Sequence, residues 1–434
     1  MESVDVYTKQ QRIAELAKRH PKLSFTSLAY YIDLEWLKEA YRLTRKDAAA
    51  GVDNVTAEEY GAHLEDNLKV LLERFKSGSY NAPPVRRVYI PKGDGKEQRA
   101  IGIPTMEDKI LQRAVVMLLT PLYEQEFLNC SYGFRPKRSV YQALDMLWQT
   151  VMDMRECWVY EVDIRKYFDT VKPEHIREFL KKRVNDGVIT RIIGKWLKAG
   201  VMEDGAIHFR EEGTPQGGVV SPLLSNLYLH EVLDIWFAKE IRHRLSRKAN
   251  LVRFADDFVM AFESKEDAQR VQTVLYKRFG KYGLTINEEK SRILWFGKPR
   301  EGNQKPDSFT FLGFTHYWGQ SLKGNWVVKK KTAKNKLKNA IRKVFQYCKA
   351  NRHEPVAEQW KKLGRKVKGH YAFYGVTHNL RSMTIYKRAV ERSWYFWLGR
   401  RSRDNVMPWD RFKKLLEKYP LPKPRIVHSR LAKP

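Results

Sequence analysis

Two adjacent carboxylates stand inside an otherwise apolar run of the sequence. The run Arg253–Met260 reads Arg-Phe-Ala-Asp-Asp-Phe-Val-Met, with Asp256 and Asp257 at its centre. Apolar residues on both sides predict two strands with the aspartates at the tip of a β-hairpin. Carboxylates this close repel each other, so they persist beside positive charge, and a divalent metal ion is the usual solution. Taken alone, the pair also suits a polar hairpin turn.

A third carboxylate stands in a similar setting upstream. Asp163 lies in the strand-like run Val159–Asp169, directly after the apolar Val162 and before Ile164. If the fold brings Asp163 beside Asp256, the three carboxylates complete a site for two hard cations. Such a site drives in-line phosphoryl displacement, in which one metal activates the attacking hydroxyl and the other stabilises the leaving pyrophosphate.

Between these two runs, a loop rich in glycine and proline leads into an apolar helix. The segment Gly213–Tyr228 begins Gly-Thr-Pro-Gln-Gly-Gly. Because glycine has no side chain, the backbone of such a loop can approach a flat ligand closely. The same pattern also suits an ordinary turn at the start of a helix.

The order of these three runs resembles the palm of a reverse transcriptase. An aspartate in a strand, a Pro-Gln-Gly loop and an aromatic-Ala-Asp-Asp hairpin follow one another in that family as they do here. Further segments resemble its other blocks, in the form used by group II intron-encoded proteins. They are the fingers hairpin at Arg87–Arg99, the next block at Ser131–Ser139, the later palm block at Tyr282–Ser291, the primer grip at Phe309–Phe314 and the maturase (X) domain from Tyr371 to Ser429. The resemblance covers nearly all of the chain.

The resemblance implies a metal site. Asp163, Asp256 and Asp257 match the catalytic carboxylates of the family, and Ile164 belongs with them to the expected metal-binding residues. The implied cofactor is a pair of Mg²⁺ ions, for which Mn²⁺ is a possible substitute.

The resemblance also implies how nucleotides bind. Lys92 and Arg99 match the fingers residues that hold the incoming triphosphate, and charged donors suit phosphate. Gln216 matches the loop residue beside the incoming nucleotide. Phe168 matches the aromatic steric gate that collides with a 2′-hydroxyl, which implies a preference for deoxynucleotides. Lys290 resembles the lysine proposed to protonate the leaving pyrophosphate, a general-acid role.

Each of these assignments has a plainer alternative. Phe168 would also serve as a core residue, and Lys92 and Arg99 would suit a solvated charged hairpin. Lys290 follows two glutamates and would form a surface ion pair of little energetic value. Phe254 is a departure, since group II proteins usually carry tyrosine there. The change keeps the aromatic ring, so we expect polymerisation to survive it.

Composition points to a polyanionic partner. The 434 residues include 81 Lys and Arg against 50 Asp and Glu, which gives a formal net charge of +31. Hydrophobic residues make up 43% of the chain, enough for a core. No apolar stretch approaches ~18 residues and the first residues lack a signal-peptide pattern, so we expect no membrane association. Three widely spaced cysteines predict a reducing cytoplasm and no structural zinc.

The predicted fold class is α+β, a right-hand polymerase with fingers, palm and thumb. We expect a helical N-terminal extension at 1–85, fingers and palm at 86–318, a helical thumb and maturase domain at 319–420, and a C-terminal tail at 421–434. Helical spacing predicts helices that start near Leu34 and Pro104 and cover about 356–374 and 381–400. Thr56 with Glu59 has the pattern of a capping box.

One basic segment predicts contact with phosphates. The segment Ser321–Lys349 contains ten basic residues and no acidic ones, while Leu337, Ile341, Val344 and Phe345 form a helical apolar stripe. Such a run is usually a solvated face, but ten unbalanced like charges favour a phosphate-binding helix, at the position of the first thumb helix. The predicted nucleic-acid contacts are Lys330, Lys334, Lys338, Arg342, Arg400 and Arg401.

These observations predict an RNA-directed DNA polymerase that also binds group II intron RNA as a splicing maturase. Its other partners would be an RNA template with a DNA primer, and deoxynucleotides. Since no HNH endonuclease follows, we expect insertion to be primed from a nascent strand or an existing end. The alternatives are a free-standing reverse transcriptase in defence or repair, and a non-enzymatic RNA-binding splicing factor. Phe168 disfavours an RNA-dependent RNA polymerase.

Overall fold

The computed structural model describes residues 5–92, 97–203, 206–208, 217–300, 305–401 and 407–429. The chain divides into two compact units, Met1–Ala143 with Trp158–Ile293, and Leu144–Cys157 with Leu294–Pro434. Helices and mostly antiparallel sheets occur together, so the α+β class is confirmed. The finer division into four parts stays a prediction.

From Val6 to Ser77 the chain is mainly helical. The elements are α1 (Val6–Arg19), the 3₁₀ turn η1 (Leu28–Tyr31), α2 (Leu34–Leu43), α3 (Ala57–Ala62) and α4 (Leu64–Ser77). Helix α2 starts where the side chain of Asp33 accepts a hydrogen bond from the Trp36 amide. Helix α3 starts with the predicted capping box of Thr56 and Glu59. Both starts could be predicted because capping depends on residues close in sequence.

A four-stranded sheet and a buried helix follow in the first unit. The sheet has the order β2-β1-β4-β5, formed by β1 (Val85–Lys92), β2 (Glu97–Ile103), β4 (Val201–Glu203) and β5 (Ala206–His208). Helix α5 (Met106–Tyr123) begins at the cap Thr105, and residues on all its sides are buried. This burial explains why the predicted helix is apolar all round rather than amphipathic.

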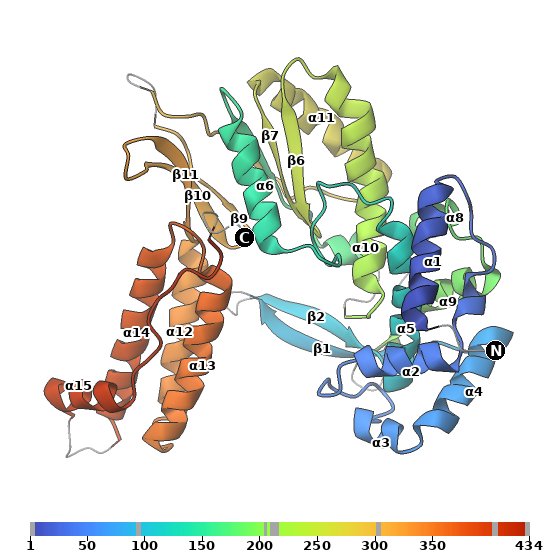
Figure 1. The fold of residues 1–434 in the computed structure, drawn as a ribbon, viewed down its shortest axis with the longest axis horizontal. Helices are drawn as coiled ribbons and strands as arrows, with labels where there is room; N and C mark the ends of the chain where they lie inside the picture. The colour runs from blue at the N-terminus through green and yellow to red at the C-terminus, as the bar shows by residue number, and fades with distance from the viewer. Residues whose placement is uncertain are drawn as a thin grey trace. The chain divides into compact units, whose positions relative to one another are not determined.

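A second sheet carries the aspartate runs of the first unit. Its order is β6-β7-β3-β8, with β6 (Ala249–Phe254), β7 (Asp257–Phe262), β3 (Trp158–Val162) and β8 (Arg292–Trp295). Helix α11 (Lys265–Lys281) packs against this sheet (Figure 1). Residues 217–220 lead into helix α10 (Ser221–Leu229), while the earlier part of the Gly/Pro loop lies outside the described residues. The chain continues through η2 (His230–Asp234), η3 (Trp236–Ile241) and η4 (Arg242–Arg244).

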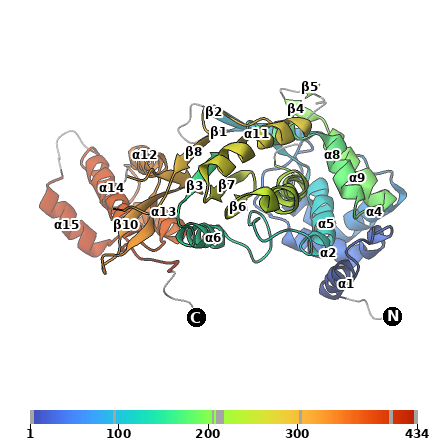
Figure 2. The ribbon, with the colours of Figure 1, turned by 90° about the horizontal axis from the view of Figure 1, so that it is seen from above.

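Three further helices of the first unit come directly after strand β3 in sequence. They are the short α7 (Tyr167–Thr170), α8 (Pro173–Lys181) and α9 (Gly187–Lys198). Helices α8 and α9 pack against each other and lie side by side in Figure 2. Asp186 caps α9 by accepting hydrogen bonds from the amides of Val188 and Ile189.

The second unit combines a three-stranded sheet with long helices. The sheet has the order β11-β10-β9, from β11 (Trp326–Thr332), β10 (Phe314–Gln320) and β9 (Phe309–Phe311). The helices are α12 (Lys334–Ala350), α13 (Val356–Tyr374), α14 (Leu380–Leu398) and α15 (Trp409–Lys418), while α6 (Val140–Met152) crosses from the first unit into the second. Helix α14 packs against both α12 and α13 (Figure 1). Trp394 on α14 is fully buried.

Candidate active site

The aspartate pair lies at the turn of a tight β-hairpin, as predicted. Strands β6 and β7 pair antiparallel up to Phe254 opposite Asp257, which leaves Ala255 and Asp256 as the two turn residues. Ala255 has a positive φ of 57°, a conformation that a two-residue hairpin turn requires but that alanine rarely adopts. Asp256 is half-buried and Asp257 is exposed. Surrounding contacts must therefore hold the strained turn in place.

A buried arginine supplies one of these contacts. Arg253 sits on β6 directly before the turn and is 0% exposed, as is its partner Asp234. The guanidinium donates from Nε to Asp234 Oδ1 at 2.8 Å and from Nη2 to Oδ2 at 2.5 Å. Burial by itself would raise the pKa of Asp234, but the Arg253 charge and hydrogen bonds hold that pKa below its usual value. The pair is a fully desolvated, bidentate ion pair.

The same guanidinium reaches the turn itself. Arg253 Nη1 donates to the carbonyl oxygen of Ala255 at 2.9 Å and to Asn226 Oδ1 on α10 at 3.1 Å. Asn226 in turn donates to the carbonyl of Gly133 at 2.7 Å. A Cβ atom at Gly133 would lie 2.3 Å from the Ala255 amide nitrogen, so only glycine permits this close backbone approach. The turn is thus supported from three segments.

The third aspartate follows the neighbouring strand. Strand β3 pairs antiparallel with β7 up to Val162 opposite Phe258, and Asp163 comes next in the chain. Asn287 Nδ2 donates to Asp163 Oδ2 at 3.1 Å, and the Asn287 amide donates to the Asp163 carbonyl at 2.8 Å. The amide of Asp163 donates to Ser291 Oγ at 3.0 Å. The segment around Asn287 therefore orients this carboxylate from outside the strand.

Electrostatics connect Asp163, Asp256 and one cation of the first sheet. The pKa of Asp256 is raised, mainly by burial and also by the negative charge of Asp163, while the positive charge of Arg99 opposes the rise. The negative charges of Asp163 and Asp256 repel each other, and Arg99 already offsets part of this repulsion at Asp256. A bound cation would offset it further. Carboxylate oxygens are also the ligands that Mg²⁺ prefers. In residues 5–429, within the described ranges, no three acidic, histidine or cysteine side chains are grouped closely enough to hold a metal ion.

The remaining nucleotide-site predictions fall on several elements. Phe168 is half-buried on α7, and its ring meets that of Tyr167 edge-on at 5.2 Å between centroids. Tyr167 is anchored by its hydroxyl, which donates to the Ser225 carbonyl on α10 at 3.0 Å. Lys290 is exposed and follows Asn287 in a turn. Phe168 therefore lies next to Tyr167, which is held by α10. Lys290 lies in the segment whose Asn287 and Ser291 bond to Asp163.

The fingers-type residues are only partly described. Arg99 is exposed on β2 opposite Ile90, and Lys92 ends β1 opposite Glu97, although its side chain lies outside the described part. Gln216 lies outside the described residues. Directly after it, Gly217 has φ 112°, and a Cβ there would lie 2.4 Å from the Gly102 carbonyl on β2. The end of the Pro-Gln-Gly loop therefore runs against the β1–β2 hairpin.

The predicted nucleic-acid contacts divide into two groups. Lys334, Lys338 and Arg342 are exposed on α12, and exposed Arg400 stacks its guanidinium on Phe396 at 3.5 Å from the ring centroid. Lys330, in contrast, is 3% exposed with Nζ 3.6 Å from Asp145. Arg401 is half-buried and donates to the Arg352 carbonyl at 2.6 Å. Since Lys330 and Arg401 are engaged within the protein, we leave them out of the proposed nucleic-acid surface.

Comparison with protein families identifies the chain. The family model described as reverse transcriptase (RNA-dependent DNA polymerase) matches residues 90–316, which contain all three aspartates. The chain belongs to the reverse transcriptase family. The sequence prediction of an RNA-directed DNA polymerase is thereby confirmed.

Relatives support the group II intron resemblance of this reverse transcriptase. It is 34% identical over 338 residues to protein YkfC of Escherichia coli K12, covering 70% of this chain and 86% of that protein. It is 30% identical over 350 residues to the group II intron-encoded protein LtrA of Lactococcus lactis subsp. cremoris, covering 67% of this chain and 58% of LtrA. Nuclear intron maturase 4 of Arabidopsis thaliana matches at 22% over 211 residues, 48% of this chain and 25% of that protein.

Sequence reasoning missed the residues that position the aspartates. Asp234 and Asn226 precede Arg253 by 19 and 27 residues, so no local pattern joins them. One feature of the sequence could have indicated such a partner, namely that Arg253 is a charged residue in an otherwise apolar strand. A charge at such a position requires a buried partner.

Proposed function

We propose that this protein is a right-hand polymerase that copies RNA into DNA and binds group II intron RNA as a splicing maturase. The observation that carries the proposal is the hairpin of Asp256 and Asp257 beside Asp163 in a chain of the reverse transcriptase family. In this proposal the β6-β7-β3-β8 sheet is the palm, the β1–β2 hairpin is the fingers and the α12–α14 helices are the thumb.

The three aspartates would hold two Mg²⁺ ions, with the backbone of Ile164 close by. When bound, these ions supply charge neutralisation for attack of a primer 3′-hydroxyl on the α-phosphate of a deoxynucleotide. The protein's own contribution is orientation. Asn287 fixes the Asp163 carboxylate, and Arg253 fixes the turn that carries Asp256. Arg99 adds positive charge in the field of Asp256.

Nucleotide binding would use the residues around this centre. Lys92 and Arg99 would bind the triphosphate, Gln216 would lie beside the nucleotide, and Lys290 would donate a proton to the leaving pyrophosphate. The exposed position of Arg99 and Lys290 leaves both side chains accessible to a ligand.

Phe168 would exclude ribonucleotides. We expect Phe168→Ala to raise incorporation of ribonucleotides relative to deoxynucleotides by about tenfold or more, because the ring no longer meets the 2′-hydroxyl. Competitive extension with both nucleotide types measures the ratio. Tyr30→Ala, which removes an exposed ring among the N-terminal helices of the same unit, is the control. An unchanged ratio would assign Phe168 to the core instead.

RNA binding for splicing is proposed from charge and from the relatives. LtrA and the Arabidopsis maturase are named as intron proteins. The net charge of +31 suits a large polyanion, and α12 presents exposed Lys334 and Lys338 on one face, one turn apart. We propose that this face follows a template–primer duplex, while the N-terminal helices and the thumb bind the intron.

Primer extension tests the polymerase. The assay uses an RNA template, a DNA primer, deoxynucleotides and Mg²⁺, and compares the wild type with Asp256→Asn/Asp257→Asn. We expect extension by the wild type and a loss of at least about a thousandfold in the variant. Asp47→Asn/Asp410→Asn removes the same charge at two exposed positions and should extend normally. If the wild type binds RNA tightly but never extends, the splicing-factor alternative holds.

A further inference from the structure

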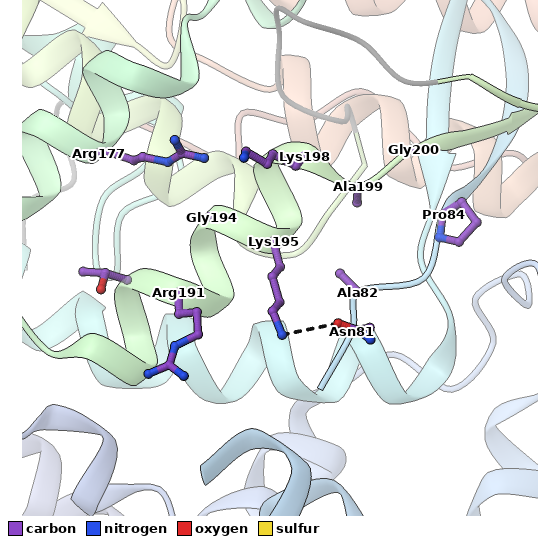
Figure 3. Close-up of a pocket in the computed structure, with 11 residues that line it drawn as sticks. Asn81, Ala82, Pro84, Arg177, Arg191, Gly194, Lys195, Lys198, Ala199 and Gly200 are labelled. Carbon is purple, nitrogen blue, oxygen red and sulfur yellow. Dashed lines mark hydrogen bonds between the residues drawn. The ribbon is translucent and has the colours of Figure 1, made fainter. Parts of the chain in front are cut away.

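A basic cavity lies in the first unit, and it is lined by none of the proposed catalytic residues whose side chains the structure describes. Its volume is about 570 Å³, and its walls come from helices α8 and α9 and from the segment that precedes β1 (Figure 3). Four cations line it, namely Arg177, Arg191, Lys195 and Lys198, and none of the lining residues that the structure describes is acidic. This cavity, the α9 pocket, is not explained by the polymerase chemistry.

Helix α9 builds the pocket through its amphipathic pattern. Its apolar side chains Ile189, Ile192, Ile193, Trp196 and Leu197 are buried. Arg191, Lys195 and Lys198 follow at helical spacing on the other face, with Gly194 among them. The cations are therefore gathered on one face by the same periodicity that buries the apolar residues.

One of the four cations has a structural role. Lys195 Nζ donates to the carbonyls of Gly78 and Tyr80, at 2.8 and 2.6 Å, and so ties α9 to the segment before β1. Lys195 and Lys198 also stand in the last turn of α9, where the helix dipole favours positive charge. These effects do not explain why Arg177 on α8 and Arg191, nearer the start of α9, are positively charged residues of the pocket wall.

Among the described residues, the other three cations have no acidic partner. Across the described ranges of the chain, no ion pair is formed by Arg177, Arg191 or Lys198. Figure 3 shows the ends of Arg177 and Lys198 directed toward one another across the pocket. Like charges that face each other repel, and an anion between them would turn this repulsion into two attractions. A Cβ at Gly194 would lie 3.8 Å from Arg177 Nε, so glycine keeps the wall beside the guanidinium free of a side chain.

We propose that the α9 pocket binds a phosphate group of an intron RNA strand. The proposal rests on the proposed function, since it assigns one contact of the intron RNA that the protein would bind as a maturase. Arg177 would bind the phosphate with its planar fork and Lys198 would bind it as a point charge. The exposed amide of Asn81 and the ring of Pro84 line the same cavity, which has room for a nucleotide beyond its phosphate.

RNA binding by the full chain tests this proposal. Arg177→Gln/Lys198→Gln is compared with Lys239→Gln/Lys277→Gln, which removes the same charge from two exposed positions of the same unit. Affinity for a structured group II intron RNA is measured across a salt series. We expect the pocket variant to bind about tenfold or more weaker than the control, with a salt slope smaller by about one to two units. Thermal unfolding confirms that both variants fold.

Two further measurements separate the possible outcomes. Primer extension on a short template–primer should stay at the wild-type level in the pocket variant, which distinguishes loss of this contact from failure of the polymerase proposal. Equal intron affinity of the pocket and control variants would overturn the proposal. If, in addition, inorganic phosphate stabilises the wild type and not the pocket variant, the pocket takes a free phosphate rather than an RNA strand.

Discussion

A single buried residue, Arg253, connects the carboxylate turn to the body of the first unit. Its guanidinium and the Asp234 carboxylate are both fully buried, a state that costs several kcal/mol in desolvation and that an apolar pair would avoid. In return, the ion pair positions the turn, because the same guanidinium donates to the Ala255 carbonyl inside the strained turn. We infer that the pair fixes the direction of Asp256.

Substitutions of Arg253 can distinguish its effect on stability from its effect on the position of the turn. Arg253→Met leaves Asp234 buried without its partner, and we expect a loss of about 3–5 kcal/mol in the free energy of unfolding. Arg253→Met/Asp234→Leu replaces the pair with apolar residues and should recover most of that stability. Primer extension should nevertheless remain about ten- to a hundredfold reduced in the double variant, because the Ala255 carbonyl still lacks its donor.

Urea unfolding and single-turnover extension measure these effects. Arg278→Met is a control, because this arginine also donates to backbone carbonyls but does not touch the turn. Full recovery of extension by the double variant would show that Arg253 acts through stability alone.

The sequence could indicate the three aspartates as candidate metal ligands, but not the residues that hydrogen-bond to their segments. Asp163, Asp256 and Asp257 each interrupt an apolar run, which a single sequence displays directly. Asn287 and Asn226 are ordinary polar residues in their own segments, and their roles arise only when strands and helices meet. Tertiary hydrogen bonds of this kind leave no periodic signal along the chain.

At the scale of the element, local signals located helices better than strands. Helix α13 occupies the predicted residues, and α14 differs by one or two residues at its ends. The basic run from Ser321 was expected to be a helix, yet its first part forms strand β11, which pairs with β10. Val328, Lys330 and Thr332 alternate inward there, so the partner strand overrides the charge pattern. Phe345, in the predicted apolar stripe, is 37% exposed, and its ring contacts those of Phe396 and Trp397.

Strand β10 contains a buried histidine that weakens its own hairpin in acid. His316 is 0% exposed, stacks on Phe309 and pairs across the strands with Lys330. In the part of the chain that the structure describes, neither ring nitrogen of His316 has a hydrogen-bond partner. Burial, and then the Lys330 charge, lower its pKa from 6.5 to about 3.

The stability of the folded chain depends on pH because the unfolded chain takes up a proton at His316 more readily than the folded chain does. Between pH 6.5 and about 3 the unfolded chain protonates His316 and the folded chain does not, so stability falls as the pH decreases through this window. We expect His316→Phe to stabilise the hairpin by about 1 kcal/mol at pH 7 and by roughly 2 kcal/mol more at pH 5. Amide exchange of β10 at both pH values measures the gain.

An exposed histidine provides the control for this prediction. His353→Phe in the same unit replaces an exposed ring and should leave the pH dependence of β10 unchanged. A gain from His316→Phe that is equal at pH 5 and pH 7 would contradict a lowered pKa.

At the scale of the whole molecule, charge is the dominant property. A formal net charge of +31 on 434 residues repels itself, and a bound polyanion relieves that repulsion while releasing counterions. No helix in the described ranges is long and apolar enough to cross a membrane. Charge alone does not separate the surfaces that hold template from those that hold intron RNA, which is why the sequence could predict the partner class and not its binding path.

Helix α12 carries exposed lysines one turn apart, and two lysines on α15 have the same spacing. We expect Lys334→Gln/Lys338→Gln to lower affinity for a template–primer duplex and to reduce the salt slope of binding by about 1.4–1.8, since each lost phosphate contact removes about 0.7–0.9. Lys414→Gln/Lys418→Gln has the same spacing and charge change on α15 and should leave the slope unchanged. Equal slopes for the two variants, measured by fluorescence anisotropy, would mean that the positive charge of α12 acts only as part of the general field of the protein.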